Sequence, residues 1–159
     1  MRNLVLIFAV AGQLISCNSK KNEQIIKPLS KENPVIAKDS LIKVNIYEGL
    51  LPCADCSGIE TVLKIYQGDG TIESYKFELT TIYKGKQPEK TFTQKGNFNY
   101  ERGLENDPDG TIYVLNWDKP ESDRIYYGYK SENPKKMYLL TNKREIIKSE
   151  LNYFLTLKK

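Results

Sequence analysis

The chain has 159 residues, with 24 lysines and arginines, 20 aspartates and glutamates, and no histidine, which gives a formal net charge of +4. This small basic excess is spread along the chain, so the charge does not indicate nucleic-acid binding. Without histidine, neither a Ser-His-Asp nor a Cys-His catalytic arrangement can form. We therefore expect a non-enzymatic protein with one ordinary domain.

Residues 1–16 have the features of a lipoprotein signal peptide. Arg2 precedes an apolar run, residues 4–11, that is too short to span a bilayer as a permanent helix. The run leads to "LISC", which resembles a bacterial lipobox and would place cleavage and lipid attachment at Cys17. Asn18 is not the aspartate that often marks inner-membrane retention, so we expect lipid anchoring to the outer membrane of the cell envelope. The simpler alternative is an ordinary signal peptide with a cysteine nearby.

Residues 17–40 are predicted to be the lipidated cysteine and a flexible tether. The stretch 18–40 contains five lysines, two prolines and no aromatic residue. Such a composition cannot bury enough apolar surface to fold by itself. Cleavage would also remove Arg2, which leaves 23 basic against 20 acidic residues and a net charge of +3. The folded domain is therefore expected to be residues 41–159.

From residue 41 onward the chain has the pattern of short strands joined by polar turns. It is rich in tyrosine, and several segments alternate between apolar and polar residues. The turn signals are "GDG" at residues 68–70 and "ENDPDG" at residues 105–110. The candidate strands are residues 41–49, 59–67, 71–85, 90–101, 111–117, 124–130, 136–141, 144–149 and 151–158. These segments predict an all-β domain of about eight strands, either a sandwich or, preferably, a small antiparallel meander barrel, since closure removes exposed sheet edges.

A cysteine pair lies in the stretch "YEGLLPCADCSGIE", residues 47–60. If Cys17 carries lipid, Cys53 and Cys56 are the two cysteines left in an oxidising compartment. A disulfide between them would close a four-residue loop, which is worth only about 2 kcal/mol by chain entropy. A thioredoxin-like redox motif instead requires a helix N-terminus to stabilise the thiolate. Pro52 and the β-rich sequence that follows argue against such a helix, and Asp55 would raise a thiol pKa.

A metal site is the third interpretation of Cys53 and Cys56. Two thiolates are soft ligands that suit Cu(I), with Asp55 or solvent as a further ligand. Zinc is less suitable because it prefers four ligands. The interpretations are compatible, because a reducible disulfide could open to bind Cu(I). Pro52 and Gly58 would shape the loop ends, and a positive φ would account for the glycine.

The run "YEGLLPCADCSGIETVLKIYQGDGTIESYKFEL" resembles the N-terminal domain of the NlpE family of envelope lipoproteins. The matching residues are Gly49, Leu51, Pro52, Cys53, Ala54, Asp55, Cys56, Gly58, Ile59, Thr61, Leu63, Asp69, Gly70 and Thr71. The segments "KGNFNY" and "MYLLTNKREIIKSELNYFLTLKK" are also similar to the family pattern. The resemblance covers roughly residues 45–159.

The resemblance implies a lipocalin-like β-barrel on a lipid tether. It also implies a link to copper resistance and to envelope stress signalling through a protein partner. Longer members of the family carry a C-terminal oligonucleotide-fold domain without a counterpart in this sequence, so a sensing role that depends on that domain is not expected.

Two other functions remain open at the level of the sequence. The first is a lipocalin-like carrier of a lipid or apolar small molecule, with a purely structural disulfide. It predicts an apolar cavity lined by residues such as Tyr127, Tyr129 and Leu139. The second is an interaction scaffold without a small ligand.

Overall fold

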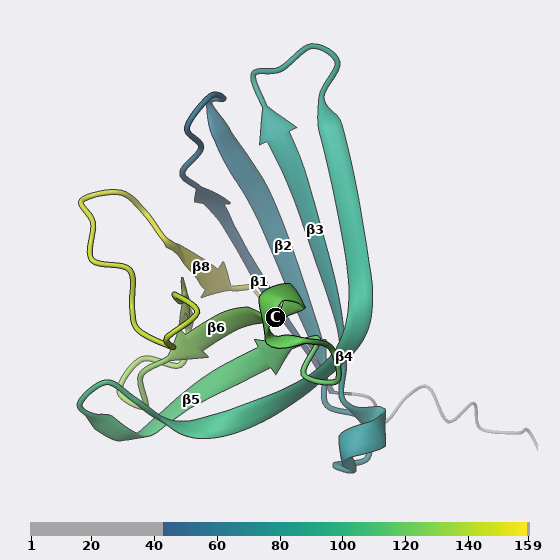
Figure 1. The fold of residues 1–159 in the computed structure, drawn as a ribbon, viewed down its shortest axis with the longest axis vertical. Helices are drawn as coiled ribbons and strands as arrows, with labels where there is room; N and C mark the ends of the chain where they lie inside the picture. Colours follow the sequence, from purple (N-terminus) through teal and green to yellow (C-terminus); the bar gives the residue numbers. More distant parts are fainter. Residues whose placement is uncertain (1–42, 159) are drawn as a thin grey trace, which may run out of the picture. The chain divides into compact units, whose positions relative to one another are not determined.

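The computed structural model describes residues 43–158, which form a closed antiparallel barrel of eight strands in sequence order (Figure 1). The strands are β1 (Val44–Leu51), β2 (Gly58–Tyr66), β3 (Lys76–Lys84), β4 (Lys90–Leu104), β5 (Asp107–Leu115), β6 (Ile125–Tyr129), β7 (Lys136–Leu139) and β8 (Phe154–Leu157). Two short 3-10 turns, η2 (Ile72–Ser74) and η3 (Glu121–Asp123), interrupt the connections. The predicted all-β meander barrel is confirmed. The predicted signal peptide, Cys17 and the whole of the predicted tether lie outside the described residues.

Alternating apolar side chains fill the inside of the barrel. In the first three strands Tyr47 pairs with Leu63, which in turn pairs with Leu79, and all three side chains are buried. Every second residue of a strand points to the same face, so this register directs one apolar row into the interior. The buried interior cluster comprises Tyr47, Leu51, Leu63, Ile65, Phe77, Leu79, Phe98, Tyr113, Leu115, Tyr127, Met137 and Leu155.

A second, smaller apolar cluster involves the opposite row of β5 residues. Ile112 and Val114 alternate with the interior residues Tyr113 and Leu115. The cluster comprises Leu104, Ile112, Val114, Tyr126 and Leu140, with Trp117, Tyr138 and Ile146 packed against it. This second cluster explains why β5 is apolar on both faces rather than alternating cleanly.

Three sequence predictions are wrong in detail. The segment 71–85 begins with η2 rather than with a strand, because the Asp69 carboxylate accepts hydrogen bonds from the amide and hydroxyl of Thr71 and starts a turn. The "ENDPDG" turn is shorter than predicted, because Leu104 already pairs with Asp107 in the β4–β5 ladder. The segment 144–149 is not a strand, and near it only an isolated bridge joins Leu140 to Ile146.

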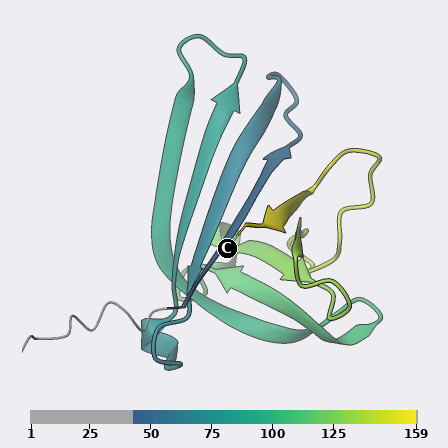
Figure 2. The same ribbon diagram turned by 180° about the vertical axis from the view of Figure 1, so that it is seen from behind.

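Strand β4 has two halves in different surroundings. Its second half, Phe98–Leu104, pairs with β5, whereas its first half, Lys90–Asn97, pairs with β3 alone among the described strands. Figure 2 shows this first half as the outer edge of the tall β1–β4 sheet. Within residues 43–158, no helix has the length and apolar character needed to cross a membrane.

Candidate metal and disulfide site

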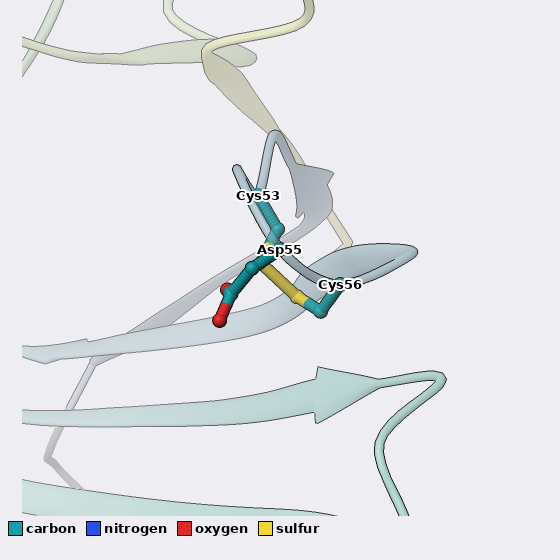
Figure 3. Close-up of side chains that lie close together, drawn as sticks. All are labelled: Cys53, Asp55 and Cys56. Carbon is teal, nitrogen blue, oxygen red and sulfur yellow. A yellow bond between two sulfur atoms is a disulfide. The ribbon is translucent and has the colours of Figure 1, made fainter.

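The loop between β1 and β2 carries the cysteine pair at one end of the sheet. Cys53 and Cys56 form a disulfide, with their Cα atoms 5.3 Å apart (Figure 3). Both cysteines are half-buried, whereas Ala54 and Asp55 between them are exposed. The predicted disulfide is therefore present in the structure, at a position where solvent reaches the loop.

The ends of this loop are set by Pro52 and Gly58. Pro52 follows the last residue of β1, where the chain leaves the ladder, and it lacks the amide that a ladder position would use. Gly58 starts β2 with a φ of 151°. A Cβ atom built there would lie 2.7 Å from Cδ1 of Leu50, so both backbone angle and space favour glycine.

Asp55 forms an ion pair with Lys86. The Lys86 Nζ lies 2.5 Å from Oδ2 of Asp55, and Oδ1 of the same carboxylate is 3.5 Å from Sγ of Cys53. The hydrogen bond from Lys86, together with its positive charge, lowers the pKa of Asp55 below its ordinary value. The carboxylate beside the sulfur therefore stays ionised, and the lysine offsets its charge.

The β3–β4 loop packs against the cysteine loop. The Ser57 amide donates a hydrogen bond to the Lys84 carbonyl over 3.0 Å. Gly85 has a φ of 78°, and a Cβ atom at this position would lie 2.2 Å from the Ser57 Oγ. This close approach brings Lys86 to Asp55 across 31 residues of sequence.

Lys86 is the site residue that the sequence analysis did not find. The position of Lys86 could have been predicted from the antiparallel meander, because the β1–β2 and β3–β4 loops of a meander lie at the same end of the sheet. The pairing of Gly58 with Lys84 then places the loop that follows β3 beside the cysteines.

The side chains of Cys53, Asp55 and Cys56 offer a compact donor set. Their ligand atoms, two sulfurs and a carboxylate oxygen, lie within 4.8 Å of one another. The set fits Cu(I), which accepts low coordination numbers and soft sulfur ligands, better than zinc, which prefers four ligands. In the disulfide the sulfurs are not thiolates, so the pair must be reduced before it can bind such an ion.

The residues predicted to line a carrier cavity lie together around the interior cluster, where Tyr127 pairs with Leu139. Tyr127 lies in the interior cluster with 2 % of its surface exposed. Leu139 packs against that cluster. Tyr129 also packs against that cluster, and it lines an open pocket of about 840 Å³ together with Tyr75, Phe98 and Tyr113 and the loop that follows β2.

The fold and the loop together define a class of protein, the small antiparallel β-barrel with a disulfide-bonded Cys-X-X-Cys loop after its first strand. The chain belongs to the NlpE family, because the model of the NlpE N-terminal domain matches residues 47–150. No curated protein sequence matches the chain.

Two crystal structures are similar to this one. A Shewanella oneidensis protein described as a lipoprotein has 29% identity and a TM-score of 0.50, over 77% of this chain and 94% of its own. The Cpx pathway activator NlpE from Escherichia coli has 25% identity and a TM-score of 0.43, over 69% of this chain and 48% of its own. The alignment with the Shewanella protein, which covers most of this chain, supports the barrel fold described above.

Proposed function

We propose that this chain is a cell-envelope lipoprotein of the NlpE type that contributes to copper resistance. Its signal-like residues 1–16 and the lipobox at Cys17 support attachment to the outer membrane by a lipid. The match to the NlpE N-terminal domain supports the same assignment. The domain would thus work in the cell envelope.

The Cys53–Cys56 loop is the proposed Cu(I) site, and the convergence of two sulfurs and a carboxylate on one accessible loop is the observation that carries this proposal. A dithiol reductant would donate two electrons and two protons to the disulfide, giving two thiols and an oxidised dithiol. Cu(I) binding to both sulfurs would then release the two thiol protons. The two thiolates would already outweigh the single positive charge of Cu(I), so Asp55 would serve as a further oxygen donor, while Lys86 would hold that carboxylate beside Cys53 and offset the excess negative charge.

The test uses the reduced full chain and a chromophoric Cu(I) chelator as competitor. Cys53→Ser and Cys56→Ser should each lower the Cu(I) affinity at least about tenfold, since one sulfur ligand is lost. Ser57→Ala, in the same loop, should leave the affinity unchanged. Bacteria that carry either cysteine variant should also grow less well in copper than bacteria with the Ser57→Ala variant. Equal copper binding by all four proteins would overturn the proposal.

Signalling to an envelope protein partner is part of the same proposal. The exposed loop changes from a closed disulfide to a metal-bound or dithiol form, and a partner could distinguish these states by shape and charge. The expected result is that a stress-responsive reporter in the envelope responds to the chain with both cysteines and not to the Cys53→Ser/Cys56→Ser variant. An equal reporter response to both proteins would show that the Cys53–Cys56 loop has no role in signalling.

A small-ligand carrier is the second candidate, favoured by the open pocket of about 840 Å³ beside Tyr113 and Tyr129. The walls mix aromatic rings with polar groups such as Gln67 and Ser131. A fluorescent fatty acid should then bind the full chain and lose affinity in the Tyr129→Arg variant. The fatty acid is kept below the concentration at which it forms micelles. If it does not bind under these conditions, the carrier function is excluded.

A further inference from the structure

The first half of β4 is a sheet edge, because among the described strands β3 alone pairs with it. Residues Lys90–Lys95 are all exposed, on both faces of the strand, although they pair with β3 in a regular ladder. The pairing with β5 starts only at Phe98. In an antiparallel ladder every second residue directs its amide and carbonyl away from its partner strand, so part of this edge presents unpaired backbone groups. Figures 1 and 2 both show this edge at the side of the tall sheet.

The charges beside this edge fall into two groups of opposite sign. Lys84 lies between two acids, with Nζ 3.4 Å from Glu60 and 3.1 Å from Glu89, so that this group carries one net negative charge. Further along the sheet Glu78 lies between two lysines, at 2.7 Å from Lys64 and 2.8 Å from Lys95, so that this second group carries one net positive charge.

Phe92 lies midway between the two charge groups along β4. It is three residues from Glu89 and three residues from Lys95. Phe92 pairs with Thr81, which pairs with the buried Thr61. Phe92 therefore lies on the inner face of the sheet, the face that carries the buried Phe98 further along β4. The Phe92 side chain is nevertheless 57 % exposed, and its ring packs edge-to-face with the Tyr83 ring, the centroids 5.7 Å apart. A large apolar side chain therefore lies at the centre of this edge, which no described strand other than β3 pairs with.

We propose that the Lys90–Lys95 edge pairs in antiparallel fashion with the same edge of a second copy of this chain, with Phe92 opposite Phe92. Cross-strand partners must share a face, so Phe92 can stand opposite residue 90, 92 or 94 of the second copy. Of these three registers, the central one alone places Glu89 opposite Lys95. The twofold symmetry then forms this acid–base pair twice.

The central register satisfies each feature of the edge at once. The negative group around Lys84 meets the positive group around Glu78 of the second copy, on the outer face of the sheet. On the inner face the two Phe92 rings cover each other. Thr91 stands opposite Thr93 of the second copy, which suits a pleated strand. The proposal is independent of the copper site, because the edge contains neither cysteine.

Cross-linking in bacterial envelopes tests the register. In the full chain, Phe92→Cys places two thiols opposite each other at the twofold axis, where Cβ atoms of paired residues are about 5 Å apart. Treatment with a thiol oxidant should give a disulfide-linked dimer on a non-reducing gel. Tyr100→Cys is the matched control, because Tyr100 is similarly exposed, at 48 %, on the half of β4 that already pairs with β5. A dimer yield at Phe92→Cys no greater than at Tyr100→Cys would overturn the proposal.

A charge exchange tests the acid–base pairing. Sedimentation of the full chain in detergent micelles should show a monomer–dimer equilibrium. Glu89→Lys and Lys95→Glu should each weaken the dimer about fivefold, because each places like charges opposite each other twice. The double variant Glu89→Lys/Lys95→Glu should restore it, since the opposite charges meet again. Both side chains are largely exposed, so circular dichroism should show an intact barrel. A chain that stays monomeric at millimolar concentration, or a double variant no better than the single ones, would contradict the pairing.

Discussion

The two halves of β4 show how differently one strand can be used. Phe98 and Phe92 are both aromatic, lie on the same face of β4 and are separated by six residues. Phe98 is 1 % exposed because β5 and the interior cluster cover it, whereas Phe92 is 57 % exposed because no described strand follows β4 at that height. The local sequence thus determines that β4 is a strand. The neighbouring strands determine whether a side chain on β4 is buried and stabilises the fold or stays exposed for contact with other molecules.

The strongest test of this comparison is a pair of truncations. Phe98→Ala should lower the free energy of unfolding by about 3–5 kcal/mol, because it leaves a cavity between Tyr75, Tyr113 and the rest of the core. Phe92→Ala should change it by about 0.5 kcal/mol or less, as at most exposed positions. Urea unfolding of both variants measures the two effects. Similar losses in the monomer would mean that Phe92 is covered by its own chain.

Alkaline pH should destabilise the barrel, because several of its tyrosines are buried. Burial raises the pKa of Tyr47 from 10.0 to about 12, and burial also raises the pKa of Tyr113 and Tyr127. The unfolded chain releases the Tyr47 proton near pH 10 and the folded chain only near pH 12. The free energy of unfolding therefore falls as pH rises between these values, by about 2–3 kcal/mol for Tyr47.

Urea unfolding at a series of pH values measures this effect. Tyr47→Phe should reduce the pH dependence, since it removes one buried titrating hydroxyl. A stability that is constant from pH 10 to 12 would be inconsistent with a buried Tyr47.

Reduction of the Cys53–Cys56 disulfide should cost less than the loss of Phe98. The bond closes a loop of four residues, for which chain entropy gives about 2 kcal/mol. The reduced barrel should therefore remain folded, with a small shift of the urea midpoint, and the Cys53→Ser/Cys56→Ser variant should unfold at the same midpoint with or without reductant. Unfolding on reduction alone would show that the loop is a structural staple and not a switch.

The smallest expected effect concerns Asp55 and Lys86. Lys86→Ala removes the hydrogen bond and the positive charge that lower the pKa of Asp55, so this pKa should rise toward its ordinary value. The Asp55 carboxyl can be followed by nuclear magnetic resonance during an acid titration. Lys90→Ala on the same hairpin is the control and should leave the Asp55 pKa unchanged. An unchanged Asp55 pKa in the Lys86→Ala variant would show that Lys86 does not interact with Asp55 in solution.

Much of the fold could be predicted from the sequence because its strands carry local signals. Alternation marks segments such as Tyr75–Leu79, and the glycines of "GDG" have positive φ where the turn requires it. The cysteine motif identified the candidate site for the same reason, since its residues are consecutive.

Features that depend on distant partners could not be predicted. Lys86 reaches Asp55 only because the β1–β2 and β3–β4 loops pack together. The exposure of Phe92 depends on where β5 starts to pair, which the sequence of β4 does not encode. The segment 144–149 has an apolar pair that suggests a strand, yet Ile146 packs against the second cluster instead. Tertiary packing overrides local preference in each case.

The decisive experiment on the proposed copper site asks whether Cu(I) binding depends on the redox state of Cys53 and Cys56. The full chain is divided into an oxidised sample, with Cys53 and Cys56 joined, and a sample reduced with a dithiol that is then removed. Both are mixed with Cu(I) without oxygen and weighed by native mass spectrometry. We expect one copper ion on the reduced chain and none on the oxidised chain. Equal copper loading of the two samples would contradict it, because the disulfide-bonded sulfurs could not then be the ligands.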